Sequence, residues 1–104
     1  MLLINLHGLF QSYGGAGAVS GVRRSLGIPT LSAVTSMIAV AGGFGSDYAR
    51  IDDLCAQLHM DIAVLQSGWV IEDFQTVTGS RSSDGDLLKK TIVSPRQYIA
   101  NAYF

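Results

Sequence analysis

Apolar residues recur at helical spacing through residues 28–45, IPTLSAVTSMIAVAGGFG, and this pattern predicts a short helix around which the rest of the chain is organised. The apolar stripe of that helix consists of Leu31, Val34, Met37, Ile38 and Ala41. A second, weakly polar face of small residues consists of Ser32, Thr35, Ser36 and Ala39. We expect the apolar stripe to face a core and the small-residue face to permit close approach by another group.

Both ends of this helix are marked in the sequence. Pro29 suits the first turn, and the hydroxyl of Thr30 or Ser32 can accept a hydrogen bond from a free amide at the helix start. Gly42 and Gly43 end the pattern. Ser46 or Asp47 can cap a second short helix that runs to about Leu58, in which Ile51, Leu54, Cys55 and Leu58 share one face.

Short apolar runs predict strands on both sides of the helices. Residues 2–7 read as a buried first strand that His7 ends, and residues 60–65 read as a second strand. A turn over residues 66–68 would return the chain into a hairpin strand that begins with residues 69–71. The polar stretch GSRSSDGD, residues 79–86, predicts a mobile loop, residues 94–98 resume extended structure, and another apolar strand starts at residues 102–104.

This order of elements predicts a single α+β domain over residues 1–104 with a β-α-β-β beginning. Such an order matches the first half of a ferredoxin-like (RRM-like) fold. The second half of that fold is not present, so we interpret the domain as truncated and its fold as incomplete. An incomplete sheet has unpaired edges that a partner can cover.

Composition is that of a globular chain with some apolar surface. Hydrophobic residues make up 48% and charged residues 14% of the 104 residues, and this balance leaves burial against another chain as an open alternative to a soluble monomer. The formal net charge of −1 excludes a whole-molecule field that attracts nucleic acid, so any RNA contact must be local. The apolar runs are too short to span a bilayer and no signal peptide is recognisable, so we expect a cytoplasmic protein with no membrane contact.

The segment Gly8–Gly27 is rich in glycine and carries Arg23 and Arg24. It lacks the third glycine of a dinucleotide fingerprint, because residue 20 is Ser20, and it contains no Gly-Lys-Ser/Thr phosphate loop. Free amides, two guanidinium groups and a following helix start can nevertheless form a seat for a phosphate backbone. A plain crossover loop is the equally open alternative.

The remaining reactive side chains do not form a recognisable catalytic or metal site. Asp52 and Asp53 are adjacent on a predicted helix and therefore do not face each other. Cys55 is the single cysteine, which excludes an internal disulfide and a cysteine metal cage. His7 has no second titratable group near it in the sequence. We therefore predict no catalytic residues, no metal, no cofactor and no small-molecule substrate.

Several short motifs occur in the order seen in one protein family. They are Leu6-x-Gly8-x-x-Gln11-Ser12-Tyr13-Gly14, an arginine at 23 or 24, Pro29-Thr30-x-Ser32 before a small-residue helix, Asp73-Phe74-x-Thr76-Val77, and Ser94-x-Arg96-x-Tyr98. Together they resemble the N-terminal half of CasD, the CRISPR-associated subunit of the RAMP superfamily that caps the 5′ handle of the guide RNA in the type I-E Cascade complex.

This resemblance implies a set of RNA-binding or Cascade-contact residues. In that family the glycine-rich loop and the helix start lie against RNA, and a thumb-like insertion, here roughly residues 72–97, contacts a neighbouring subunit along the guide. The implied residues on the RNA side are Gln11, Tyr13, Arg23, Arg24, Pro29, Thr30 and Ser32. Arg96, in the segment that returns from the thumb, is a further implied contact residue. Those in the thumb are Arg81, Lys89 and Lys90.

Three functions follow as hypotheses from the resemblance. A truncated subunit mimic, encoded by a phage or mobile element, would bind type I-E Cascade subunits and inhibit CRISPR interference as an anti-CRISPR protein. The alternative is a working handle-binding subunit of a minimal or split Cascade. RNA cleavage needs an acid and a base that converge on one phosphate, and the spacing of His7, Tyr13, Lys89 and Lys90 offers no such pair, so we predict a protein that is not an enzyme.

Overall fold

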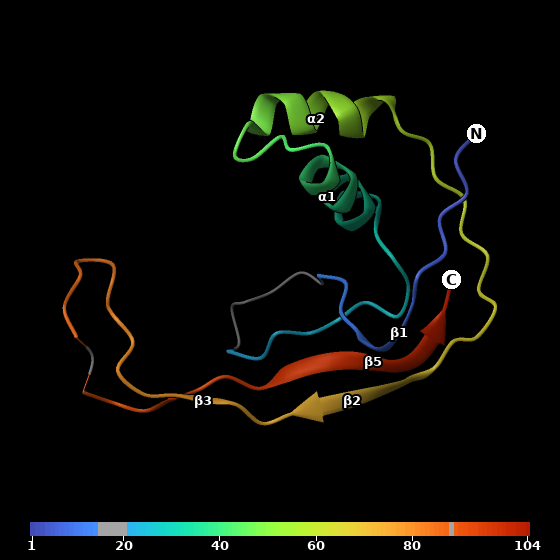
Figure 1. The fold of residues 1–104 in the computed structure, drawn as a ribbon. Coiled ribbons are helices and arrows are strands. Elements are labelled where there is room, and N and C mark those ends of the chain that lie inside the picture. The colour runs from blue at the N-terminus through green and yellow to red at the C-terminus, as the bar shows by residue number, and fades with distance from the viewer. Residues whose placement is uncertain (15–20, 88) are drawn as a thin grey trace.

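The computed structural model describes residues 1–14, 21–87 and 89–104, which form a three-stranded sheet, two helices and a projecting hairpin (Figure 1). In chain order the elements are β1 (His7–Gln11), α1 (Leu31–Ala41), α2 (Tyr48–Gln57), β2 (Trp69–Asp73), β3 (Thr76–Val77), β4 (Ile92–Val93) and β5 (Arg96–Tyr103). The predicted mixture of helices and strands is confirmed.

β5 is the central strand of the sheet, in the order β1-β5-β2. Both neighbours run antiparallel to it, so β1 and β2 run parallel to each other, and α1 and α2 lie in the connection between them. Both helices lie on the same side of the sheet (Figure 1). The sequence interpretation of residues 102–104 as the start of a further strand was wrong, because these residues belong to the end of β5 and its C-terminal neighbour Phe104.

The first strand begins at His7 instead of ending there, which corrects the predicted strand over residues 2–7. Leu6 still pairs with Phe104 through two backbone hydrogen bonds of 2.9 and 3.0 Å. Residues before Leu6 extend past the end of β5, so the described part of the chain provides no neighbouring strand for them. An apolar run by itself does not create a strand without a partner for its backbone groups.

The predicted hairpin between residues 60–65 and 69–71 was also wrong. Residues 60–64 form no strand, and β2 pairs with β5 instead, with Trp69 opposite Ala100 and Asp73 opposite Arg96. The amides of Leu65 and Gln66 both donate to the carbonyl of Tyr103, at 2.9 and 3.0 Å. The long apolar strand β5 therefore supplies the backbone partner that the sequence reading assigned to a local neighbour.

α1 begins where the sequence predicted, with Thr30 as its N-cap, and its C-cap is Gly42. The Thr30 hydroxyl accepts a 3.2 Å hydrogen bond from the Ala33 amide. The predicted orientation of α1 was wrong in part, because Thr35 and Ala39 of the small-residue face are buried with Val34. Thr35 tolerates burial because its hydroxyl donates to the Leu31 carbonyl at 2.8 Å.

Met37 of α1 also differs from its prediction. Its side chain is 48% exposed, although the sequence placed it on the apolar stripe that faces the core.

The second helix, α2, agrees more closely with its prediction. Its N-cap is Asp47, whose carboxylate accepts a 3.1 Å bond from the Arg50 amide. The predicted apolar face is half-buried at all four positions, Ile51, Leu54, Cys55 and Leu58.

The core lies between the inner face of the sheet and α1. Tyr13, Ile99, Ala102 and Phe104 form its buried centre, and Leu6, Ala33 and Ile62 pack against them. The rings of Tyr13 and Phe104 meet edge to face with centroids 6.0 Å apart. The core is small, and many apolar side chains remain at the surface.

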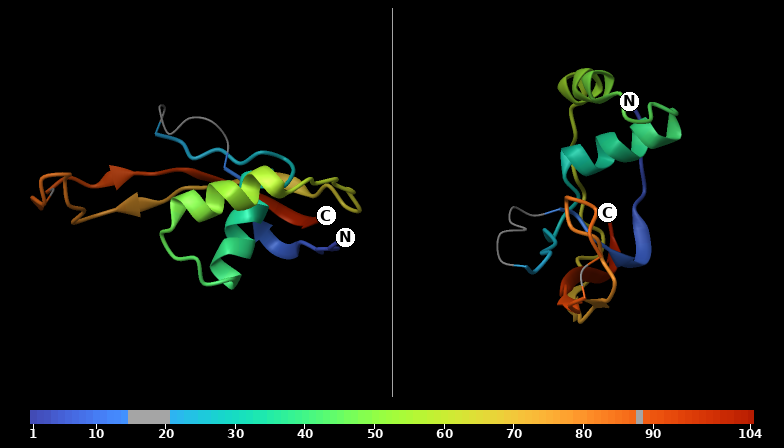
Figure 2. Two further views of the ribbon diagram at one scale, coloured as in Figure 1. Left: turned by 90° about the horizontal axis from the view of Figure 1, so that it is seen from above. Right: turned by 90° about the vertical axis from the view of Figure 1, so that its left-hand side faces the viewer.

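β3 and β4 pair with each other, Thr76 opposite Val93 and Val77 opposite Ile92, and form a two-stranded hairpin that projects from the body (Figure 2). At its far end the predicted loop over residues 79–86 contains a turn in which the Gly85 amide donates to the Ser82 carbonyl at 3.0 Å. No helix in the described ranges is long and apolar enough to cross a membrane.

Candidate functional site

Arg23, Arg24 and Arg96, which we call the arginine corner, gather at the N-terminal end of β5. The Arg23 amide donates to the Pro95 carbonyl at 3.0 Å, and the Arg23 carbonyl accepts from the Gln97 amide at 2.8 Å. These two bonds form a parallel bridge between Arg23 and Arg96. Residues 73 positions apart in the sequence are thus neighbours, and the side chains of Arg23 and Arg24 are both exposed.

Arg96 contributes a donor that the described residues leave unpaired. Its Nε atom is buried and has no hydrogen-bond partner among them. Asp73 is its cross-strand neighbour, but the Asp73 carboxylate accepts a 2.6 Å bond from the Gln75 side chain. A guanidinium group with a free donor beside a second arginine favours an anionic oxygen ligand such as a phosphate.

Gln11 and Tyr13 face inward. Tyr13 is 2% exposed, and its hydroxyl donates to the Gln11 side-chain carbonyl. The Gln11 amide group in turn donates to the Ala102 carbonyl at 2.8 Å. Burial raises the pKa of the Tyr13 hydroxyl above its ordinary value. Both side chains therefore hold β1 against β5 in this conformation.

The helix-start residues divide between packing and surface. Pro29 is buried, the Thr30 hydroxyl caps α1, and Ser32 is exposed with its hydroxyl 3.3 Å from that of Thr30. Of the three, Ser32 presents its side chain to solvent.

The predicted thumb residues Arg81, Lys89 and Lys90 lie in the projecting β3–β4 hairpin and are exposed. Arg81 donates from Nη1 to the Gly85 carbonyl at 2.9 Å, which fixes it against the turn. These residues place positive charge on an element that projects away from the helices and that also carries the exposed Asp84 and Asp86 (Figure 1).

The glycine-rich segment is closed at its base. Gly14 and Ser25 form an antiparallel bridge, and the Tyr13 amide donates to the Ser25 hydroxyl at 2.9 Å. The phosphate seat predicted for this segment depends partly on residues 15–20, which lie outside the described residues. Ser25, which joins the two ends of the segment, was not identified from the sequence because a serine in a loop carries no distinctive signal.

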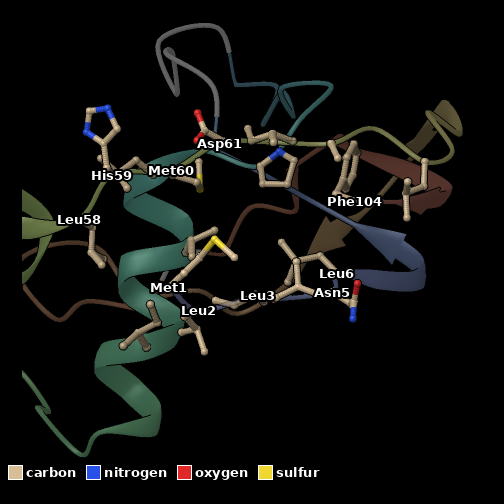
Figure 3. Close-up of a pocket in the computed structure, with 18 residues that line it drawn as sticks. Met1, Leu2, Leu3, Asn5, Leu6, Leu58, His59, Met60, Asp61 and Phe104 are labelled. Carbon is tan, nitrogen blue, oxygen red and sulfur yellow. The ribbon is translucent and has the colours of Figure 1, made fainter.

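An apolar groove of about 600 Å³ was not predicted from the sequence. It lies between the N-terminal segment, α1 and residues 58–65, and Phe104 reaches its wall (Figure 3). Leu2 and Leu3 on its rim are 74% and 82% exposed. The apolar start MLLIN was a signal for it, but we interpreted that run as a buried strand. In the described ranges, no group of three or more His, Cys, Asp or Glu side chains could hold a metal ion.

Comparison with known proteins links this arrangement to CRISPR systems. A family model described as "CRISPR-associated protein (Cas_Cas5)" matches residues 1–104. A solved chain from a "CRISPR RNA-guided surveillance complex" is 25% identical, with a TM-score of 0.70, over 95% of this chain and 44% of that chain. A search of curated proteins finds no match.

The chain thus spans less than half the length of that solved chain. The resemblance stated from sequence motifs is confirmed at the level of the CRISPR-associated family and of its relation to a surveillance complex. Since the family model covers every residue, this chain belongs to the Cas5 family of CRISPR-associated proteins.

Proposed function

We propose that this chain binds the 5′ handle of a guide RNA as part of a type I-E surveillance complex, and that it does so without enzymatic activity. The observation that carries the proposal is the arginine corner. The backbone of Arg23 is bonded to Pro95 and Gln97, which places Arg23 and Arg96 side by side, and Arg23 and Arg24 are both exposed. Neighbouring arginines on an otherwise nearly neutral chain suit a local phosphate contact.

The sheet topology supports the same function. The order β1-β5-β2, with β1 and β2 parallel and helices between them in sequence, is the order of the first three strands of a ferredoxin-like domain. RNA-binding modules of the RRM type use that architecture. Family membership and the match to a surveillance-complex chain agree with it.

The β3–β4 hairpin supplies a second contact in this proposal. Arg81, Lys89 and Lys90 are exposed on it, and a positively charged extension can follow an RNA backbone toward the next protein subunit. The hairpin would then act as the thumb that the sequence resemblance implied.

The binding test compares the chain with an arginine-corner variant. On single-stranded RNA the slope of log affinity against log salt concentration is about −0.7 for each phosphate contact. The double variant Arg23→Ala with Arg24→Ala should therefore reduce the magnitude of that slope by about 1.4. Handle-RNA affinity should fall at each salt concentration. Arg50→Ala removes an exposed arginine on α2 as a matched control and should leave affinity unchanged. A folded chain with no affinity for handle RNA, or equal affinity in both variants, would contradict the proposal.

Reconstitution with type I-E subunits separates the supporting role from the anti-CRISPR role. Both roles require the chain to enter the complex. A supporting subunit restores target-DNA binding to a complex that lacks its own handle-binding subunit, whereas an antagonist reduces target binding when added during assembly of a complete one. Recovery of a complete complex with no bound chain and unchanged target binding would exclude both roles.

A further inference from the structure

Phe10, Tyr98 and Trp69 lie on one face of the sheet, on three adjacent strands. Phe10 in β1 and Trp69 in β2 are both directly opposite Ala100 in β5. Directly opposed residues share a face, and residues two apart on a strand share a face, which adds Tyr98. The Phe10 and Tyr98 rings confirm this placement with centroids 6.3 Å apart. We call these three side chains the aromatic face.

The aromatic face is opposite the core. Ile99 lies between Tyr98 and Ala100 on β5, so it points to the other side, where it is 1% exposed and packs with Tyr13 and Phe104. Both helices lie on that inner side, and β5 and β2 form the lower boundary of the molecule in Figure 1. Accordingly, Phe10 is 63% and Trp69 59% exposed.

The geometry of the face suits flat ligands. Phe10 and Trp69 flank the small side chain of Ala100, and two strand spacings separate them by about 10 Å. Tyr98 is half-buried beside them, and its hydroxyl is 3.5 Å from the Gln75 amide nitrogen, which restricts its movement. Aromatic rings held apart on a rigid sheet can each receive the face of a nucleobase.

A positive charge accompanies the rings. Arg96 is two residues before Tyr98 on β5 and so belongs to the same face, beside Arg23 of the arginine corner. Asp73 is also on this face, opposite Arg96, and its carboxylate accepts a hydrogen bond from the Gln75 side-chain amide. Rings beside guanidinium groups provide both interactions that single-stranded nucleic acid needs, stacking for its bases and charge for its phosphates.

From this arrangement we infer that the aromatic face is a stacking platform for unpaired bases of single-stranded RNA. The inference depends on the proposed RNA-binding function for its ligand. It adds Phe10, Trp69 and Tyr98, which are not among the handle-contact residues. RNA is the occupant that we infer, because Arg96 supplies charge for its phosphates and the three rings supply faces for its bases.

Trp69 allows a direct test because it is the single tryptophan of the chain. Titration with the unpaired RNA octamers A8 and U8 should quench Trp69 fluorescence as bases stack on the ring. A fully paired RNA duplex of the same length should not quench it. Base stacking of this kind contributes about 1–3 kcal/mol per base, so Phe10→Ala should weaken octamer affinity by about 5- to 150-fold.

Controls separate stacking from folding. Leu9→Ala changes a side chain that is 78% exposed on the same strand, and it should leave affinity unchanged. Phe10→Leu keeps an apolar side chain but removes the ring, so it should lose as much affinity as Phe10→Ala. Unchanged far-ultraviolet circular dichroism in all three variants would establish that the fold is retained.

Two results would overturn the inference. One is RNA binding that depends on Arg23 and Arg24 but changes neither Trp69 fluorescence nor the affinity of the Phe10 variants, in which case the proposed function stands alone. The other is a Trp69 fluorescence change on addition of protein subunits but not RNA, which would assign the face to a protein. Quenching that requires Phe10 but not Arg23 or Arg24 would support the platform and contradict the arginine corner.

Discussion

Tyr13 connects three parts of the molecule through one side chain. Its ring packs edge to face on Phe104, and its hydroxyl bonds to Gln11, whose amide reaches the Ala102 carbonyl. This chain of contacts holds the end of β1 against β5. Because the hydroxyl is buried, loss of its proton is disfavoured in the folded state, and the pKa of Tyr13 is raised above its ordinary value near 10.

The raised pKa of Tyr13 predicts a loss of stability at high pH. Between the unfolded and folded pKa values the folded state keeps a proton that the unfolded state loses, so the free energy of unfolding falls as pH rises above about 10. Tyr13→Phe should lower the free energy of unfolding by about 1 kcal/mol at neutral pH. In this variant the free energy of unfolding should fall less above about pH 10 than in the unchanged protein. Urea unfolding at about pH 8 and about pH 11 measures both effects, and equal pH dependence in the two proteins would contradict the assignment.

Gly68 is required for backbone geometry where the chain enters β2. Its φ is 67°, and a Cβ atom there would lie 2.2 Å from the Ala100 carbonyl oxygen and 3.0 Å from the Ala102 amide. We expect Gly68→Ala to destabilise the fold by about 3 kcal/mol or more, because strain and a backbone clash combine. Gly79→Ala is the control, since φ there is 74° with no atom within 4 Å of the added Cβ. Similar unfolding midpoints for both variants would show that the clash of the added Cβ with the β5 backbone does not determine the loss of stability.

At the scale of elements, α1 combines a well-defined start with an orientation that its apolar pattern does not determine. The Thr30 cap satisfies the Ala33 amide, and the Thr35 hydroxyl bonds within the helix to the Leu31 carbonyl. The small residues Thr35 and Ala39 can therefore pack inward while Met37 stays exposed. The buried side of α1 therefore includes small residues as well as Val34.

Removal of the α1 cap tests this element. Thr30→Ala should lower the free energy of unfolding by about 1 kcal/mol, because the Ala33 amide loses its acceptor at the helix start. Ser32→Ala is the matched control, because it removes an exposed hydroxyl two residues after Thr30. It should change the free energy of unfolding by less than about 0.5 kcal/mol. Chemical denaturation of the two variants distinguishes the residues, and a larger loss at Ser32 would reassign the cap.

At the scale of the whole molecule, one apolar groove lies between the N-terminal segment, α1 and residues 58–65. The side chains that line it include Leu3, Val34, Ile62 and Phe104. Exposed apolar surface of this extent is characteristic of protein contacts. We therefore expect a protein contact at this groove, separate from the charged and aromatic surfaces that we assign to RNA.

A charge introduced into the groove should weaken protein assembly without weakening RNA binding. Leu3→Asp places a carboxylate on the apolar rim and should reduce co-purification with surveillance-complex subunits by about tenfold or more. Val40→Asp provides the control, because Val40 is 78% exposed on α1 and does not line the groove. Co-purification that is equally reduced by both substitutions, or by neither, would remove the groove from the interface.

The sequence by itself determined the local features of this protein. It limited the helix caps to Thr30 or Ser32 and to Ser46 or Asp47, and the structure selects Thr30 and Asp47. The glycine end of α1, the apolar face of α2 and the loop over residues 79–86 also follow from contacts within a few residues, which sequence patterns report directly. The ordered motifs from Leu6 to Tyr98, which include Thr30, carried the resemblance to a CRISPR-associated family that the family model confirms.

Only the tertiary structure decided which distant segments pair and which faces they expose. β5 takes β1 and β2 as neighbours, although the sequence suggested a local hairpin, because backbone pairing depends on all competing strands and not on adjacency. The same pairing brings Arg23 beside Arg96, turns Tyr13 inward, and aligns Phe10, Tyr98 and Trp69 on one face. Contacts between residues separated by 70 or more positions leave no periodic signal in the chain, so the candidate sites became visible only in the folded molecule.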